Sequence, residues 1–273
     1  MVRIICSILL VSTSLFCTAL EDSIQNFIGE QAYYTNQNFI KRLFKDEKKF
    51  TPDGKLDYFL ILKTLKDNGL LELVFSEPSE LQITLKAKSK PIFLTRAVNS
   101  TLSSIGYSYF TISKAKYDQG EVELTFSLVT EHILDPVVFL NELKKRGITP
   151  LKVRRDDLLH WQYDLEIEKW VVLDSRVLLK QERFEIKKIS GEYWFDVKTP
   201  GVLYIKKKNT RIGWFPRIVL YDKNLRILEI ITQNSFATES EIVLSEKTAF
   251  VMVTDLNNPA RLKYGLSVEF TPY

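Results

Sequence analysis

The stretch LQITLKAKSKPIFLTRAVNSTLSSIG, residues 81–106, decides how the middle of the chain folds. Between Leu81 and Leu85 apolar and polar residues alternate, and this period of two is typical of a half-buried strand. Pro91 then opens a run in which apolar residues recur every three or four positions until Gly106, as in an amphipathic helix that ends at a glycine. The stretch therefore predicts a strand followed by a helix that packs on the strand's sheet.

The next residues predict the rest of this domain. The expected elements are two strands joined by a hairpin turn, a helix and a last strand, over residues 107–117, 121–128, 137–146 and 159–167. The order β-α-β-β-α-β predicts a ferredoxin-like α+β domain over residues 79–168, with both helices on one face of an antiparallel sheet and a polar opposite face. The run Arg154-Arg155-Asp156-Asp157 interrupts the approach to the last strand, and we expect a bulge or an extra turn there.

The chain on either side has a different pattern. Residues 20–78 predict a helical lead-in, with helical periodicity over 21–50 and a second helix before Gly69. Residues 169–185 are expected to be a linker. Residues 186–273 predict an all-β antiparallel sandwich, because short apolar runs alternate with turns rich in Gly, Pro, Asn and Asp. The predicted fold class of the whole chain is α+β.

Five short motifs lie along the tail. They are Trp194-Phe195-Asp196-Val197, Pro200-Gly201, Leu203-Tyr204-Ile205, Leu220-Tyr221-Asp222 and Tyr264-Gly265-Leu266-Ser267-Val268. With them, the region from about residue 190 to 270 resembles the bacterial pre-peptidase C-terminal domain, a jelly-roll-like sandwich attached to many exported proteins. The chain departs from that family at Thr248-Ala249-Phe250, where the family usually has a glycine before its aromatic residue. The family is non-catalytic, so the resemblance implies a binding or packing role.

Residues 1–19 have the three regions of a secretory signal peptide. Arg3 supplies the positive charge, Ile4 to Phe16 is the apolar run, and small residues precede a cut after Ala19. A retained membrane anchor is the alternative, but the 13-residue run is shorter than the ~20 residues that a spanning helix needs. A lipoprotein signal with lipid on Cys17 fits badly because the bulky Phe16 precedes it. We expect cleavage after Ala19 and a periplasmic location in a bacterial envelope.

The composition disfavours several classes of function. The 38 Lys and Arg residues against 34 Asp and Glu residues leave a net charge of +4, which is too mild for a nucleic-acid-binding protein. Both cysteines, Cys6 and Cys17, lie in the predicted signal peptide, so we expect no disulfide, no metal and no cofactor. His132 and His160 are expected at the surface or on a strand face, because no Gly-x-Ser-x-Gly motif is present for a catalytic triad.

A set of acidic residues is the only candidate for catalysis. Its members are expected on the open face of the ferredoxin-like sheet: Glu121, Glu123, Asp164, Glu166 and Glu168. Two carboxyl groups could act as acid and base on a glycan. An open, solvated face is a poor place to raise the pKa of one of them by burial, so we expect no enzymatic activity.

The loop between two predicted sandwich strands is the candidate contact site. The residues predicted to contact a partner or a glycan are Trp214, Phe215, Lys206, Lys207, Arg211 and Arg217. Aromatic residues and arginines are enriched in interface hot spots, and exposed aromatic rings also bind sugars. In the alternative, Trp214 and Phe215 close the sandwich core and the lysines are solvated.

These observations predict a non-catalytic periplasmic structural or scaffold protein of a larger envelope assembly. In its layout the chain resembles the accessory proteins of periplasmic disks around the flagellar motor. Its expected partners are other periplasmic proteins, with peptidoglycan as a further candidate and no nucleic acid, and no transmembrane segment is expected after signal cleavage. The alternative function is a peptidoglycan- or glycan-binding module, and a carboxylate-dependent glycan hydrolase is the third hypothesis.

Overall fold

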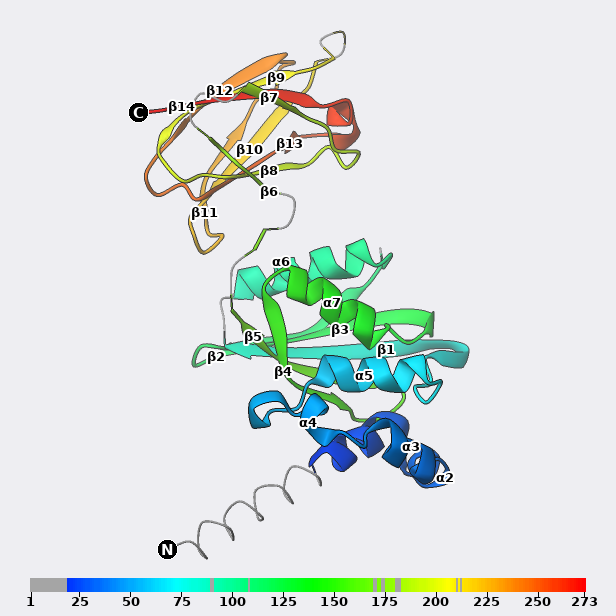
Figure 1. The fold of residues 1–273 in the computed structure, drawn as a ribbon. Coiled ribbons are helices and arrows are strands. Elements are labelled where there is room, and N and C mark those ends of the chain that lie inside the picture. Colours follow the sequence, from blue (N-terminus) through cyan, green and yellow to red (C-terminus); the bar gives the residue numbers. More distant parts are fainter. Residues whose placement is uncertain are drawn as a thin grey trace, which may run out of the picture. The chain divides into compact units, whose positions relative to one another are not determined.

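The computed structural model describes residues 19–88, 91–107, 109–168, 171, 172, 175–179, 183–209, 211 and 213–273. The chain is a mixed α+β protein, as predicted, and it divides into two units, one ending at Val171 and the other beginning at Val172 (Figure 1). The predicted signal peptide lies outside the described residues except for Ala19. Among the described helices, none is both long and apolar enough to cross a membrane.

The N-terminal segment is a series of short helices. A helix covers residues 19–28, and the elements that follow are α2 (Glu30–Thr35), α3 (Gln37–Leu43), α4 (Glu47–Phe50), the 3-10 turn η1 (Pro52–Gly54) and α5 (Tyr58–Asp67). The helical segment predicted over 21–50 is interrupted at Gly29, whose φ of 84° lies outside the helical region. Asp57 caps α5, since its side chain accepts a hydrogen bond from the backbone N–H of Leu60 (2.9 Å).

The first unit is built on one five-stranded sheet. The strands are β1 (Val74–Lys88), β2 (Thr111–Asp118), β3 (Glu121–His132), β4 (Ile148–Arg155) and β5 (His160–Ile167), in the spatial order β2-β3-β1-β5-β4. The neighbours β1 and β5 are parallel, and all other neighbours are antiparallel. The sheet is therefore mixed, which corrects the prediction of a wholly antiparallel sheet, because the chain forms β4 before it returns as β5 beside β1. Helix α6 (Pro91–Ser104) connects β1 to β2, and α7 (Pro136–Lys145) connects β3 to β4.

The prediction of a bulge or an extra turn at residues 154–157 is correct only for Asp156 and Asp157, which begin a bend, because Arg154 and Arg155 are the end of strand β4. Strand β4 forms an antiparallel hairpin with β5 around a bend at residues 156–159. The pairing shifts between Pro150 and Lys152, so the buried side chains of β4 do not alternate along the whole strand. Such a bulge hides a strand from a search for period-two alternation.

Aromatic side chains form the centre of the first core. Trp161 and Tyr163 lie two residues apart on β5 and therefore share a face, with ring centroids 6.2 Å apart. Phe27 stacks on Trp161 (6.1 Å), and Phe139 of α7 packs on Tyr163 (5.2 Å). Tyr58, the first residue of α5, packs edge-on against Phe27 (6.4 Å). The helix that carries Phe27, α5 and α7 therefore cover the same face of the sheet.

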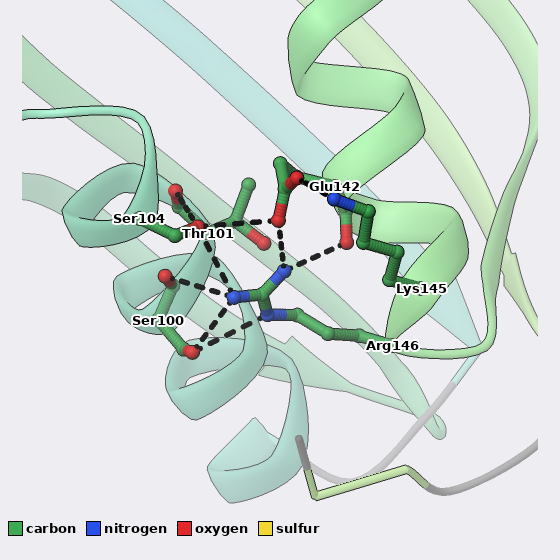
Figure 2. Close-up of polar contacts among 6 residues, drawn as sticks. All are labelled: Ser100, Thr101, Ser104, Glu142, Lys145 and Arg146. Carbon is green, nitrogen blue, oxygen red and sulfur yellow. Dashed lines mark hydrogen bonds and ion pairs between the residues drawn. The ribbon is translucent and has the colours of Figure 1, made fainter. Parts of the chain in front are cut away.

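A buried arginine joins α6 to α7 (Figure 2). Arg146 follows α7 and is 3% exposed. Its guanidinium donates to the hydroxyl of Ser100 (2.9 Å), to the carbonyl of Ser100 (3.0 Å) and to the hydroxyl of Ser104 (3.2 Å). It also pairs with the carboxylate of Glu142 (3.0 Å), which accepts a second bond from Lys145. The buried charge is thus fully hydrogen-bonded, as a buried ion pair requires.

The second unit consists of two sheets that pack face to face as in a β-sandwich. One sheet has the order β11-β10-β13-β8-β6 and contains β6 (Ser175–Val177), β8 (Tyr193–Asp196), β10 (Pro216–Tyr221), β11 (Ile227–Thr232) and β13 (Phe250–Asp255). The other has the order β12-β9-β14-β7 and contains β7 (Arg183–Ile186), β9 (Gly201–Lys207), β12 (Glu239–Leu244) and β14 (Leu266–Pro272). Both sheets contribute side chains to one core, among them Phe195, Ile205, Val253 and Phe270.

Two strands of this unit lie in the segment 169–185 that was predicted as a linker. Strand β6 pairs in parallel with β8, and β7, which extends to Ile186, pairs with β14. Strand β6, with three residues, is too short to show a clear alternation of polar and apolar residues, whereas β7 coincides with the start of a β-rich run that the sequence shows at residues 184–189.

Candidate contact surfaces

Trp214 is part of the core of the second unit. Its side chain is 0% exposed and belongs to the same buried cluster as Ile205 and Ile218. Trp214 lies on the loop that connects β9 to β10. Its backbone forms two hydrogen bonds with Ala237 (3.0 and 2.9 Å), which lies just before β12. The prediction that this ring contacts a partner or a glycan is therefore corrected in favour of the core alternative, because a ring without exposed surface has nothing to offer a ligand.

Lys207 is a second predicted contact residue that the fold buries. Side chains alternate along β9, and Lys207 continues the inward row of Leu203 and Ile205, with 2% of its surface exposed. Its ammonium group lies 3.4 Å from the carbonyl oxygen of Gly213. Burial lowers the pKa of Lys207, while the nearby carboxylate of Asp255 acts in the opposite direction. Lys207 is thus a buried side chain beneath the loop and not part of its exposed surface.

The other predicted contact residues do not share one surface. Lys206, Arg211 and Arg217 are exposed, and Phe215 is half-buried. Lys206 projects from the sheet that contains β9, and its ammonium group lies 3.7 Å from the carboxylate of Glu239. Arg217 projects from the sheet that contains β10. Because the outer faces of a sandwich point in opposite directions, these charges cannot act on one ligand.

The predicted contact residue Phe215 forms an aromatic pair with Phe236, which no sequence pattern had singled out. Phe236 is 62% exposed, and its ring centroid lies 4.3 Å from that of Phe215. The guanidinium of Arg261 lies 5.0 Å from the Phe215 ring and 5.6 Å from the Phe236 ring, within the range of a cation–π contact. The buried carboxylate of Asp255 accepts a bond from the backbone N–H of Phe215 (2.9 Å). Phe215 and Phe236 are 21 residues apart and both are distant in sequence from Asp255 and Arg261, so no local pattern could have predicted this cluster.

The edge strand β11 exposes apolar side chains. Ile227, Leu228 and Ile230 are 57%, 42% and 48% exposed. The strand has one charged residue, Glu229, and neither lysine nor proline. A six-residue segment of high β propensity and low charge at an open sheet edge is suited to pairing with another strand.

The backbone of β11 is also positioned for such pairing. The N–H of Gln233, directly after β11, bonds to the carbonyl of Pro216 in β10 (3.0 Å). Hydrogen-bonded and non-hydrogen-bonded pairs alternate in an antiparallel ladder, so the backbone groups of Ile231 face β10. Those of Ile230 and Thr232 consequently face the open edge.

The other edges are less suited to pairing with a partner strand. Strand β2 has Lys114 and Lys116 and a shift in its pairing, and β4 has Pro150 and Lys152 and a shift of its own. Strands β6 and β7 are three and four residues long, and β12 carries two glutamates. Lysine, proline, bulges and short length are the features by which proteins protect sheet edges. Strand β11 has a shift of its own where it pairs with Leu220 and Tyr221, but it has six residues and neither lysine nor proline, which leaves it the least protected edge among the described strands.

The polar face of the first sheet carries a row of alternating charges. In register across the five strands stand Lys116, Glu123, Lys86, Asp164 and Lys152. Each charge lies opposite a charge of the other sign, which stabilises neighbouring strands. A hollow of about 970 Å³ lies over part of this row.

Among the acidic residues of this face, Glu123 has an environment opposite to that of a general acid. Glu123 accepts a hydrogen bond from Lys114 (2.7 Å). That bond lowers the pKa of Glu123, and Lys86 and Lys116 act in the same direction. A carboxyl group that donates a proton to a glycosidic oxygen near neutral pH needs a raised pKa, and Glu123 has the opposite shift.

The two histidines lie in different surroundings. The imidazole Nδ1 of His160 lies 2.7 Å from the carboxylate of its neighbour Asp157, and His132 is exposed. Within the described ranges, no three His, Cys, Asp or Glu side chains are grouped so that they could hold a metal ion. No protein-family model matches the chain, and no curated protein matches it.

Proposed function

We propose that the protein is a non-catalytic structural or scaffold protein of a periplasmic envelope assembly, and that a partner protein adds a strand to β11. The observation that carries this proposal is the contrast among the sheet edges. Strand β11 combines exposed apolar side chains with outward-facing backbone groups at Ile230 and Thr232, whereas the other edges carry protective residues or are short.

The outer face next to β11 defines the chemistry of the partner. In register with Ile230 stand Val219, Met252 and Trp194, which form an apolar row across four strands. These three side chains are 2%, 9% and 4% exposed, so Ile230 is the exposed end of the row. A partner strand would extend it with an apolar side chain next to Ile230, while its backbone bonds to the open edge.

The topology of the two units and the environment of Glu123 support a structural, non-catalytic role. The order β2-β3-β1 supports a ferredoxin-like plan for this part of the sheet, whereas β5, which lies parallel to β1, departs from the antiparallel neighbour that this plan requires. The two packed sheets support the resemblance of the tail to the pre-peptidase C-terminal sandwich, which is jelly-roll-like and non-catalytic. The lowered pKa of Glu123 favours a non-catalytic protein over the hydrolase hypothesis. A component of a disk around the flagellar motor is the specific assembly that we propose.

The test blocks the open edge without disturbing the fold. Thr232→Pro removes an N–H that faces the edge, and Ile230→Lys places a charge at the end of the apolar row. Both variants should keep a melting temperature close to that of the unchanged protein, yet should no longer co-fractionate with the envelope assembly. Val243→Lys on β12 is the matched control, since Val243 is an exposed apolar residue (60%) on another edge strand.

A crosslink identifies the contact directly. The chain after Cys17 contains no cysteine, so Ile230→Cys and Val243→Cys each introduce a single thiol once the signal peptide is removed. A crosslink to an assembly component should form from residue 230 and not from residue 243. Normal assembly of both edge variants, or equal crosslinking from the two positions, would disprove strand addition at β11.

A further inference from the structure

The second unit has a hollow on the outer face of the sheet that contains β9, and Gln233, directly after β11, is among its lining residues. Its volume is about 610 Å³, and Tyr204 of β9 lies within it with 41% of its surface exposed. Directly opposite Tyr204 stand Glu241 of β12 on one side and Glu269 of β14 on the other. Arg183 of β7 follows next to Glu269. An aromatic side chain is thus flanked by two carboxylates on a concave strand surface.

The next row of side chains on this face adds hydrogen-bond donors and acceptors. Lys206 of β9 lies opposite Glu239 on β12 and Ser267 on β14. Two ion pairs, Arg183 with Glu269 and Lys206 with Glu239, each have a nitrogen–oxygen distance of 3.7 Å. Exposed ion pairs of this kind contribute little free energy, so a ligand can replace one partner at a small loss in stability.

Two groups at the centre of the hollow are available to a ligand. The carboxylate of Glu241 and the hydroxyl of Tyr204 make no hydrogen bond or ion pair with any other residue in the described part of the chain. An aromatic ring offers an apolar surface, and the surrounding carboxylates, hydroxyls and cations offer acceptors and donors at its edges. This combination suits a molecule that has one C–H face and several hydroxyl groups around its rim.

We propose that this hollow is a saccharide-binding site for an uncharged sugar or N-acetylamino sugar unit of an envelope glycan. The sugar ring stacks on Tyr204, its hydroxyls donate to Glu241, and Lys206 and Ser267 donate to its oxygens. The three carboxylates outnumber the two cations, Arg183 and Lys206, which disfavours phosphate-rich and other anionic polymers. The volume falls in the range of small-molecule sites.

Calorimetric titration of the processed full-length chain with chitotriose and cellotriose tests the site. At least one of these sugars should bind saturably. Tyr204→Ala should weaken the affinity at least about tenfold, since the loss of a stacking surface removes most of the apolar contact. Tyr204→Phe should keep most of the affinity, and Glu241→Gln should weaken it less than Tyr204→Ala does. Val243→Ala, on the same strand as Glu241 but outside the hollow, should leave it unchanged.

The result is independent of the proposed strand addition. Ile230→Lys should bind the sugar normally, and Tyr204→Ala should still enter the assembly, because the two residues lie on different sheets. Absence of saturable binding to either sugar, or binding that survives Tyr204→Ala, would overturn the saccharide site. Tight binding of heparin that depends on Tyr204 would also overturn it, because it would show that the hollow prefers polyanions.

Discussion

The side-chain amide of Asn26 forms two hydrogen bonds with the backbone of Arg155. Its Nδ2 donates to the Arg155 carbonyl (3.0 Å), and its Oδ1 accepts from the Arg155 N–H (2.9 Å). The guanidinium of Arg155 in turn donates to the carbonyl of Phe27 (3.0 Å). Asn26 thus takes the place of a neighbouring strand at the end of β4, and the N-terminal helix becomes a part of the first unit.

Asn26→Ala should therefore destabilise the first unit. Loss of two partly buried hydrogen bonds should lower the free energy of unfolding by about 1–2 kcal/mol, because two backbone groups of Arg155 lose their partner. Chemical denaturation measures this change. Asp22→Ala, an exposed change on the same helix, is the control and should have little effect. Equal stability of the two variants would contradict a role of Asn26 in closing the edge of β4.

Glu142→Gln should make the stability less sensitive to acid. The hydrogen bond from Lys145 lowers the pKa of Glu142 below its ordinary value of 4.5, and Arg146 acts in the same direction. The folded state therefore favours the carboxylate, and this contribution is present above pH 4.5 and lost as the pH falls through the lower folded-state pKa. Denaturation at neutral pH should show the variant about 1–3 kcal/mol less stable. The difference should shrink toward pH 3, and a constant difference would contradict the ion pair.

Trp214→Ala should mainly affect folding. Truncation of a fully buried tryptophan should cost about 3–5 kcal/mol, because it leaves a cavity in the sandwich core. Phe236→Ala removes a ring that is 62% exposed and should change stability by less than about 1 kcal/mol. Melting temperatures of both variants test the comparison. A Trp214→Ala protein that melts like the unchanged protein would restore the prediction that this ring is a contact.

Residues 172–273 should fold without the first unit. The core of the second unit is formed by residues between Leu178 and Phe270, so its burial does not depend on the preceding chain. The isolated fragment should show a cooperative thermal transition and a β-rich circular dichroism spectrum. An unfolded fragment would show that the boundary at Val171 and Val172 does not separate two independent units.

The exported protein should begin at Leu20. Cleavage after Ala19 follows from the charged, apolar and small-residue regions of residues 1–19. N-terminal sequencing of the protein from a periplasmic extract measures the cut. The processed chain should also keep its melting temperature in a reducing agent, since both cysteines are removed. A chain that begins at Met1 would contradict export by this route.

The sequence alone determined the α+β class and the position of the regular strands. The alternation from Leu81 to Ala87 and the glycine at position 106 are local signals, and they predicted a strand and the end of a helix that the structure contains. Strand β4 escaped prediction because its bulge breaks the period of two. Local periodicity indicates whether a segment forms a helix or a strand and which side of it is buried. This information extends over only about ten residues.

Only the tertiary structure showed which residues are exposed and which of them lie together at the candidate contact surfaces. A single tryptophan on a loop has no period, so the sequence left Trp214 equally suited to a core and to a surface. The exposure of β11 depends on which strands lie beside it, and its residues resemble those of an internal strand such as β13. The hollow around Tyr204 joins residues from four strands that are distant in sequence. Such proximity is set by strand order and register, which no local pattern encodes.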